Sequence, residues 1–343
     1  MRIIIPSIQV PFIKGGAELM TEGLRDALVK RGHEVEIVTI PFKFFPEEYI
    51  SQSMDLWREQ DFNNFNGYQV DLVIVLRFPA YYVQHHNKVL WLMHQHRSVY
   101  ELYDEKNTTA KIEILKKKIY TCDAKELKKI PKRYSMCQNV SNRLKKFNGI
   151  DATPVYHPPA NAYKFYCEES HGFIFYPSRL EELKRQSLLI EAMQYTKSKA
   201  VAIIAGEGGQ HETYKQLIKK LDISEKVSLV GYVSEIEKFI LYAKSLAVFF
   251  APYDEDYGYI TLEAMLSSKP VITCTDSGGP LEFVVDNETG FVLEPDPRQI
   301  AQIIDWLYDN QHKAKELGLN GLQVYYDLNI SWDNVVTRLL ENR

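Results

Sequence analysis

Short apolar runs of four to seven residues alternate with amphipathic stretches along the whole chain. Most of these runs show no alternation of apolar and polar positions and are rich in Ile, Val and Phe, as is typical of parallel strands buried on both faces. In the first half they predict strands at Arg2–Ile5, Val35–Ile40, Asp71–Leu76, Lys88–Met93 and Tyr134–Gln138. In the second half they predict strands at Gly172–Tyr176, Ala200–Ala205, Lys226–Val230, Leu246–Phe250, Pro270–Thr273 and Gly290–Leu293.

Between the predicted strands lie stretches with helical spacing of apolar residues, such as Ala17–Arg31, Gln186–Met193 and Glu212–Lys220. This regular alternation of strands and helices predicts an α/β fold with a doubly wound parallel sheet. The alternation restarts after Pro158 and Pro159, which cannot continue a helix or a central strand. Because 343 residues also exceed the length of one typical domain, we expect two such domains.

We place the first domain at residues 1–157 and the second at residues 158–322. The remaining segment, residues 323–343, carries Trp332, Val335, Val336, Leu339 and Leu340 at helical spacing. It is therefore predicted to form a terminal helix. The spacing does not indicate which domain this helix packs against.

Composition narrows the class of protein. With 45% hydrophobic and 25% charged residues the chain is typical of globular proteins, which excludes disordered and collagen-like classes. The net charge of −4 argues against a dedicated nucleic-acid binder. The four cysteines form no Cys-x-x-Cys pair, and no apolar stretch approaches the length of a membrane span. We expect a cytoplasmic protein.

Positive charge is concentrated between Lys106 and Lys146, a segment that contains thirteen Lys and Arg residues and three Asp and Glu residues. This basic segment is therefore +10 and the rest of the chain −14. Within it Ile112, Leu115 and Ile119 recur at helical spacing. The segment is either a solvated helix face or a surface for anionic lipid or an anionic acceptor. Nucleic acid is the weakest interpretation, because aromatic stacking residues are not clustered there.

Ligands of doubly wound sheets bind at the carboxyl ends of the strands, so the loops that follow strands are the places to look for chemistry. Gly15 and Gly16 directly precede a predicted helix, where two glycines allow backbone amides to approach a phosphate. Such a pair is equally compatible with a simple turn. After the first strand of the second half come Arg179 and Lys184, which could clamp a diphosphate or pair with Glu181 and Glu182.

The segment 251–265 follows an apolar strand and opens a helix near Gly258. Glu255 lies in its loop and Glu263 lies more than one turn into the helix. Carboxylates accept hydrogen bonds from the hydroxyls of a sugar or a ribose, and a helix N-terminus favours a phosphate beside them. The pattern therefore indicates a site for a phosphorylated, hydroxyl-rich ligand.

These features occur in the order seen in a known family. Arg179 with Lys184, the two glutamates around Gly258, Gly278-Gly279 with Glu282, and the run from Asn287 to Gly290 resemble the donor half of a retaining glycosyltransferase of family four. The resemblance implies a GT-B fold, in which two Rossmann-like domains face a cleft that holds a nucleotide-sugar. It also implies that the first domain binds the acceptor and that the terminal helix packs back on that domain.

The resemblance implies roles for the matching residues of the second half. Arg179 and Lys184 would bind the diphosphate, Glu263 the ribose, and Glu255 the donor sugar. The backbone around the diphosphate and sugar would come from Gly258, Tyr259, Ile260 and Thr261, and the base would contact Tyr232 and Val233.

In the first half, Gly15 and Gly16 resemble the loop that closes onto the phosphates. His94 best matches the family's active-site histidine and would orient the sugar, with His96 as the alternative.

Asp254 and Asp256 read as Asp-x-Asp, a pattern that can hold a divalent metal near a diphosphate. Because Arg179 and Lys184 already supply positive charge, we expect no metal and no cofactor, with the nucleotide-sugar as a substrate. The expected acceptor is a glycan or a lipid-linked molecule, as in polysaccharide or glycolipid synthesis. The alternatives are a nucleotide-sugar epimerase of the same fold, or a non-catalytic protein that binds polyanions or membranes through the basic segment.

Overall fold

The computed structural model describes residues 1–12 and 15–341, which form two compact units. Unit 1 contains Met1–Ala160 together with the residues from Ser331 onward, and unit 2 contains Asn161–Ile330. The chain therefore leaves unit 1 once and returns to it. Its first crossing, at Ala160, lies three residues beyond the boundary predicted from sequence.

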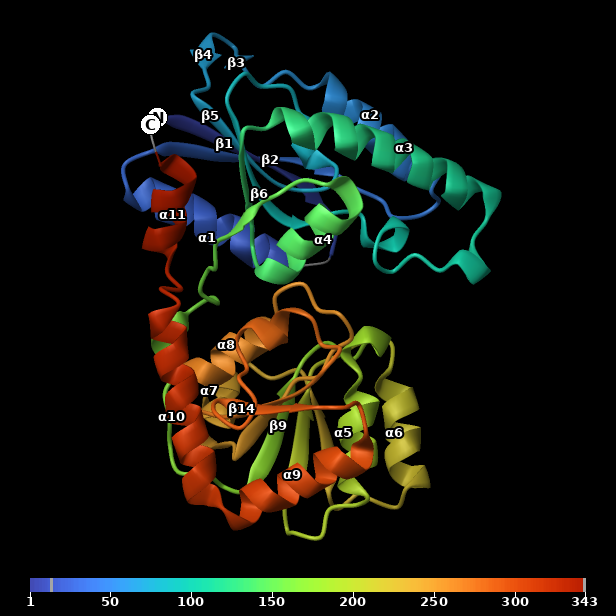
Figure 1. Ribbon diagram of the computed structural model, residues 1–343, viewed down its shortest axis with the longest axis vertical. Coiled ribbons are helices and arrows are strands. Elements are labelled where there is room, and N and C mark those ends of the chain that lie inside the picture. Colours follow the sequence, from blue (N-terminus) through green and yellow to red (C-terminus); the bar gives the residue numbers. More distant parts are fainter. Residues whose placement is uncertain (13–14, 342–343) are drawn as a thin grey trace. The chain divides into compact units, whose positions relative to one another are not determined.

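Unit 1 is built on a six-stranded parallel sheet with the order β2-β1-β5-β6-β7-β8 (Figure 1). The strands are β1 (Arg2–Gln9), β2 (Glu34–Pro41), β5 (Leu72–Arg77), β6 (Lys88–His94), β7 (Lys132–Ser135) and β8 (Thr153–Pro154). A small antiparallel hairpin consists of β3 (Asn64–Phe65) and β4 (Tyr68–Gln69). The predicted parallel sheet is confirmed. The two-residue strands were not predicted, because they are too short to carry a hydrophobic pattern.

Strand β1 runs four residues past its predicted end and contains Pro6. Proline cannot donate a ladder hydrogen bond, which is why the prediction stopped at Ile5. In the structure β1 pairs with β5 only at Ile3 and Ile4, whereas its pairing with β2 continues to Gln9. Pro6 therefore lies where the strand has one neighbour instead of two, and the strand tolerates it.

The helices of unit 1 are α1 (Gly16–Lys30), α2 (Glu48–Glu59), α3 (Ala110–Glu126), α4 (Gln138–Asn148) and α11 (Trp332–Leu340). Single 3-10 turns lie at η1 (Ala80–Tyr82), η2 (Arg97–Val99), η3 (Glu105–Asn107) and η4 (Leu127–Lys129). Helix α3 begins where the Thr109 side chain accepts a hydrogen bond from the amide of Ile112. Helix α4 ends at Gly149, whose φ of 64° is the left-handed conformation that favours glycine.

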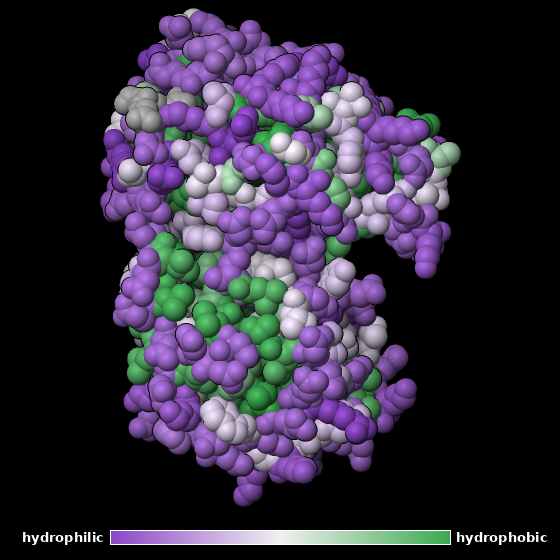
Figure 2. Space-filling view, in the orientation of Figure 1, coloured by the Kyte–Doolittle hydropathy of each residue, from purple (hydrophilic) through white to green (hydrophobic). Residues whose placement is uncertain are grey.

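Unit 2 repeats the architecture with a parallel sheet of order β11-β10-β9-β12-β13-β14. Its strands are β9 (Phe173–Pro177), β10 (Val201–Ala205), β11 (Val227–Gly231), β12 (Ala247–Phe249), β13 (Val271–Cys274) and β14 (Gly290–Leu293). Its helices are α5 (Gln186–Met193), α6 (His211–Lys220), α7 (Glu235–Lys244), α8 (Tyr259–Leu266), α9 (Pro297–Asp309) and α10 (Gln311–Asp327), with 3-10 turns η5 (Ala162–Lys164), η6 (Glu182–Lys184) and η7 (Gly279–Glu282). Apolar side chains gather on the face of unit 2 around α8 and β14 (Figure 2).

The predicted terminal helix over residues 323–343 is wrong as a single element. Its first five residues end α10 in unit 2, and a separate helix, α11, begins at Trp332 in unit 1. Between them Asn329 adopts a left-handed φ of 49°, and the Ser331 side chain caps α11 by accepting a hydrogen bond from the amide of Asn334 at 3.1 Å. These residue types, Asn and Ser before a new apolar period, are the signal that marks the break.

Helix α11 packs against α1, and Gly23 makes this close approach possible. A side chain at Gly23 would collide with the ring of Trp332. On the same helix pair, the Arg31 guanidinium donates to the Thr337 hydroxyl at 3.0 Å and lies 3.2 Å from the Asp333 carboxylate. The unit 1 fold therefore depends on a segment that is far from the rest of it in sequence.

His157 lies between the rings of Trp332 and Trp91, in the interior of unit 1. Burial lowers the pKa of His157 to about 3, so the imidazole stays neutral at physiological pH. The aromatic contacts join α11 to strand β6, which carries Trp91. They tie the last described helix to the centre of the sheet.

Candidate active site

The loops at the carboxyl ends of the unit 2 strands are hydrogen-bonded to one another. The amide of Ser178 donates to the carbonyl of Ala205 at 2.9 Å, and the amide of Leu180 donates to the carbonyl of Glu207 at 2.9 Å. A side chain at Gly206 would collide with the carbonyl of Ser178. The segment after β10 therefore needs glycine at this position. Its glycines let it pack against the loop that presents Arg179.

Arg179 extends from this loop into solvent, with 62% of its side chain exposed. Its guanidinium pairs with Glu181 at 2.9 Å, one of the two alternatives left open by the sequence. An exposed ion pair of this kind contributes little to stability and is readily exchanged for another partner. Arg179 is therefore accessible to an anionic ligand.

Lys184 and Glu255 meet although 71 residues separate them in sequence. The Lys184 ammonium donates a hydrogen bond to the Glu255 carboxylate, and both side chains are about four-fifths buried. The sequence offered Glu182 as a possible partner of Lys184, but the ion pair is formed with Glu255. The structure thus brings the residue predicted to bind the diphosphate into direct contact with the residue predicted to bind the sugar.

Arg185 holds the loop that carries Glu255. Its guanidinium donates to the carbonyls of Ala251 and Pro252 at 2.8 and 3.0 Å and makes a bidentate contact with Asp276 at 2.7 Å. Sequence analysis missed this residue, because an arginine beside Lys184 gives no signal of which of the two cations is structural. The bidentate geometry assigns Arg185 to the framework of the site.

The backbone of Glu255 is held on both sides. Its amide donates to the carbonyl of Ser277 at 2.9 Å, and its carbonyl accepts from the amide of Gly279 at 2.8 Å. A side chain at Gly279 would lie 2.7 Å from the carbonyl of Asp256, so glycine is required for this approach. The contacts place the loop after β13 alongside the loop after β12. Glu255 is consequently positioned by two segments of the sheet edge.

Helix α8 begins at Tyr259, after Gly258 with a φ of 83°. Of the three predicted amide donors Tyr259, Ile260 and Thr261, the last is already engaged, because its amide donates to the carbonyl of Gly258 at 3.0 Å. The first turn of a helix leaves amides without intrahelical partners and carries partial positive charge. The partial positive charge at the N-terminus of α8 therefore adds to the charge of the Lys184 ammonium.

Glu263 lies within α8 and is 9% exposed. One carboxylate oxygen accepts a hydrogen bond from the Tyr242 hydroxyl at 2.7 Å, and the other lies 3.3 Å from the Lys238 ammonium. Lys238 also pairs with Glu235 at 3.1 Å. Burial raises the pKa of Glu263. Sequence analysis missed both partners, since they lie on α7 and only the fold brings that helix beside α8.

The two residues after β11 separate in the structure. The Tyr232 side chain is 74% exposed, whereas Val233 is half-buried and packs against the core of unit 2. Of this predicted pair, Tyr232 is the one whose ring is free to stack on a ligand.

In unit 1, Gly15 is the N-cap residue of α1, and the side chain of Glu18 reaches back to its backbone. Its amide donates to one carboxylate oxygen of Glu18 at 2.9 Å, while the other oxygen accepts from Arg77 at 2.9 Å. Gly16 is the first residue of the helix. The glycine pair therefore stands at a helix N-terminus, as predicted, with a partly buried Arg–Glu pair beside it.

His94 ends β6 and is half-buried, with its Nδ1 2.7 Å from the carbonyl of Gln95. The alternative, His96, is buried against Phe78 and contacts the Ser98 hydroxyl at 3.0 Å. Burial lowers the pKa of His96 to about 4, so its ring is a neutral framework group. Of the two histidines, His94 is the one accessible to a substrate.

A buried polar cluster anchors the residue between these histidines. The side-chain amide of Gln95 donates to Asp123 at 3.0 Å and to Asn148 at 2.9 Å. Asp123 also accepts from three tyrosine hydroxyls, at 2.5 to 2.8 Å, those of Tyr81, Tyr82 and Tyr100. Sequence analysis missed this cluster because its members come from four separate segments. The cluster holds the backbone next to His94.

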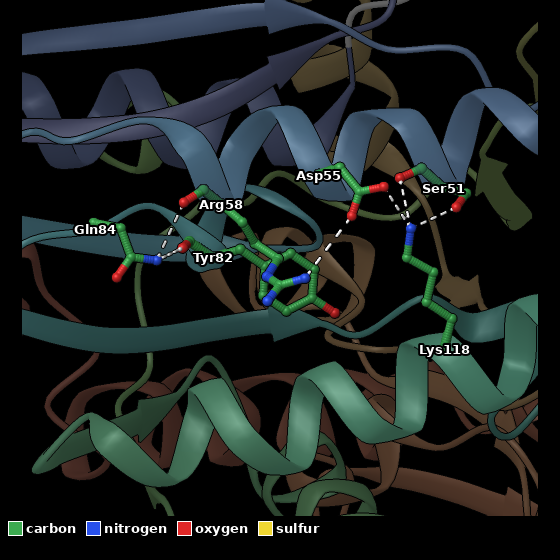
Figure 3. A network of polar contacts seen from close by, with 6 residues as sticks. All are labelled: Ser51, Asp55, Arg58, Tyr82, Gln84 and Lys118. Carbon is green, nitrogen blue, oxygen red and sulfur yellow. Dashed lines mark hydrogen bonds and ion pairs between the residues drawn. The ribbon is translucent and has the colours of Figure 1, made fainter.

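In the structure, the basic segment does not form a helix whose apolar side is exposed to solvent. The apolar stripe points inward, with Leu115 and Ile119 at most 6% exposed. Lys118 is also engaged, since its ammonium donates to Ser51 and lies 2.6 Å from Asp55 on α2 (Figure 3). Leu115 and Ile119 are therefore not available to a membrane, so any contact with an anionic surface would depend on the remaining cations.

Within residues 1–12 and 15–341, no group of three or more His, Cys, Asp and Glu side chains is arranged to hold a metal ion. Over the same residues, every helix is too short or too polar to cross a bilayer. The Asp-x-Asp pattern at Asp254 and Asp256 therefore has no third ligand of these types gathered around it.

Parts of this chain are similar in sequence to known proteins. Residues 167–324 match the family described as glycosyl transferases group 1. The human alpha-1,3/1,6-mannosyltransferase is 28% identical in an alignment 160 residues long, which covers 42% of this chain and 38% of the human protein. This chain thus corresponds to less than half of the length of that relative.

Solved structures resemble the whole chain. Sucrose-phosphate synthase from Thermosynechococcus elongatus has a TM-score of 0.78 at 17% identity and covers 98% of this chain and 96% of its own. Anabaena HepE in complex with UDP-glucose has a TM-score of 0.71 at 16% identity and covers 99% and 98%. At such identities the likeness concerns the fold, which is the GT-B fold expected from the sequence.

Proposed function

We propose that this protein, whose residues 167–324 belong to the glycosyl transferases group 1 family, moves a sugar from a nucleoside-diphosphate sugar to a glycan or lipid-linked acceptor. Unit 2 binds the donor and unit 1 binds the acceptor. The observation that carries the proposal is the Lys184–Glu255 ion pair at the carboxyl edge of the unit 2 sheet, beside the N-terminus of α8. A diphosphate would replace the carboxylate as partner of Lys184, and Glu255 would then contact the sugar.

The proposed transfer retains the anomeric configuration. The anomeric carbon passes through an oxocarbenium-like state as the nucleoside diphosphate leaves. Arg179, Lys184 and the α8 N-terminus stabilise the negative charge that grows on the leaving group, because they are in place before the reaction begins. The acceptor hydroxyl attacks from the leaving-group side and gives its proton to a phosphate oxygen. Glu255 stabilises the positive charge on the ring.

The experiment incubates the purified protein with uridine and guanosine diphosphate sugars and measures release of the nucleoside diphosphate. Slow hydrolysis of at least one donor is expected, since water can replace the acceptor. A product in which the sugar is inverted at another carbon, with the nucleotide still attached, would instead indicate an epimerase. If no nucleotide or nucleotide-sugar binds in calorimetry, the proposal is wrong.

We expect this activity to need no divalent metal, because the charge on the leaving diphosphate is met by Arg179 and Lys184. Activity in EDTA should equal that in added magnesium or manganese. Loss of activity in EDTA with recovery on adding either metal would contradict this expectation. It would point to Asp254 and Asp256 as ligands.

The exposed cations of the basic segment are proposed to attract an anionic membrane surface. Lys117, Lys125 and Lys128 are exposed, whereas Lys118 is engaged with α2. Near such a surface each lysine contributes about 1 kcal/mol, so changing these three to glutamine should lower binding to phosphatidylglycerol vesicles by about two orders of magnitude. The matched control changes three exposed lysines of α6, Lys215, Lys219 and Lys220. Equal binding of both triple variants, or no salt dependence, would leave the segment as a solvated face.

A further inference from the structure

A cavity of about 500 Å³ opens beside His94 in unit 1. Its walls come from the segment before α2, from α2, from the turn after β6 and from α3. The lined surface is mostly apolar and is provided by Phe44, Ile50, Val99, Leu102, Ile112 and Leu115. The polar side chains of the lining include Glu47 and Arg97. Protein interiors pack densely and leave few voids larger than a water molecule. A space of this size lies in the range of ligand sites.

The walls of the cavity are held at a fixed spacing. Ile50 lies on α2 and Ile112 on α3, and these helices run side by side (Figure 1). The Lys118 ammonium donates to the Ser51 hydroxyl at 2.7 Å, one residue from Ile50 (Figure 3). At the start of the helices the Lys111 ammonium lies 2.7 Å from Glu48. These polar contacts join the two helices beside an apolar space that neither helix fills.

The segment that leads to the cavity exposes aromatic side chains. Phe44, which lines the cavity, is 55% exposed, and its neighbours Phe45 and Tyr49 are 75% and 42% exposed. A group of exposed aromatic rings beside an apolar cavity is typical of a surface that contacts an apolar ligand. A cation lies beside these rings. Lys43 directly precedes Phe44 in sequence, and its ammonium lies 4.8 Å from the centre of the Tyr49 ring.

Charge and polarity together specify the ligand. An apolar cavity favours a hydrocarbon chain. The basic segment, which contributes Ile112 and Leu115 to the wall, carries +10 and favours an anionic group at the end of that chain. His94, at the carboxyl end of β6, borders the same cavity.

We propose that this cavity binds the apolar chain of a lipid-linked acceptor whose lipid is joined to its sugar through a phosphate or diphosphate. The proposal rests on the proposed function and specifies the acceptor that unit 1 takes. The chain lies among Phe44, Ile50 and Ile112, the anionic group lies toward the basic segment, and the sugar hydroxyl lies toward His94.

The experiment compares two tryptophan substitutions two residues apart on α3. Ile112→Trp fills the cavity, whereas Ile114→Trp changes a side chain that is 69% exposed and does not line it. The probe is 11-(dansylamino)undecanoic acid, whose fluorescence rises on transfer to an apolar site. The wild type and Ile114→Trp should bind it with the same Kd, and Ile112→Trp should bind it at least tenfold more weakly.

Alkyl phosphates of eight, ten and twelve carbons, each below its micelle concentration, then compete for the probe. Burying one methylene contributes about 0.8 kcal/mol, a fourfold change in Kd, so each added pair of carbons should tighten binding about 15-fold. Inorganic phosphate alone should not compete at similar concentrations. Affinity that is independent of chain length, or equal in all three proteins, would overturn the proposal.

Two further measurements separate the possible failures. Nucleoside diphosphate affinity and the thermal unfolding midpoint should be unchanged in Ile112→Trp, which shows that the variant is folded and that unit 2 is intact. If the wild type binds the probe as described but no nucleotide, the proposed function fails while the apolar site stands. If the probe does not bind and Ile112→Trp abolishes a dimer seen in sedimentation, the cavity covers a second copy of this chain, and the lipid proposal is overturned.

Discussion

Replacing Lys184 with alanine is expected to lower the rate of sugar transfer by about 10- to 150-fold. The range follows from the 1.5–3 kcal/mol that a charge-assisted hydrogen bond contributes, expressed as a rate. Lys184 is four-fifths buried, so solvent screens its charge weakly. Arg179→Ala should fall in the same range but toward its lower end, because the Arg179 side chain is mostly exposed.

Steady-state rates and calorimetry with nucleoside diphosphate measure this effect. The matched control is Glu181→Gln, which removes the exposed partner of Arg179 and should change turnover only a few-fold. In the double variant Lys184→Ala with Glu255→Gln the losses should not add, because the two side chains contact one another. Near-normal turnover and donor affinity in both the Arg179 and Lys184 variants would refute their assignment to the diphosphate.

Substitutions of the two glutamates should separate binding from turnover. Glu263→Gln should weaken the nucleotide-sugar and the free nucleoside diphosphate alike, by about 10- to 150-fold, because the ribose is common to both. Glu255→Gln should leave the affinity for free nucleotide nearly unchanged and lower turnover by about 100- to 1000-fold, since its charge acts as the sugar ring becomes positive. The exposed Glu288→Gln is the control for an amide substitution in unit 2.

The pH dependence of nucleotide binding gives a second test of Glu263. Burial raises the pKa of this carboxyl, so it binds a proton at a higher pH than an exposed glutamate would. Nucleotide affinity should therefore fall as the pH falls through this raised pKa, and Glu263→Gln should remove that step. Lys238 keeps Glu235 as a partner in the variant, which leaves no buried cation unpaired. If Glu255→Gln abolishes nucleotide binding while Glu263→Gln changes nothing, the placement of the donor is reversed.

The sequence predicted those parts of the fold that repeat a simple period. Strand β14 and helix α5 were predicted with their observed bounds, because a buried strand and an amphipathic helix each leave a regular pattern. Exceptions had local causes, such as the single ladder partner at Pro6 and the left-handed Asn329 that separates α10 from α11.

The site was harder to predict wherever a contact joins distant segments. The residue types and spacing of Lys184, Glu255 and Glu263 are visible in the sequence, but their partners are not. Tyr242 meets Glu263 only because the fold brings α7 beside α8. The inward direction of Ile119 could not be told from an outward one, since periodicity defines a stripe on a helix and not what covers it.

Because the chain returns to unit 1, the two units are completed in a fixed order during synthesis on the ribosome. Unit 2 is one continuous segment from Asn161 to Ile330, so all of it has been translated before Trp332 is added. Unit 1 is translated first but completed second. Until α11 emerges from the ribosome, Gly23, Trp91 and His157 lack their contact with the ring of Trp332. Domains generally fold as units during translation. In this protein the second unit has its whole sequence before the first does, and α11 completes the fold to which residues 1–160 belong.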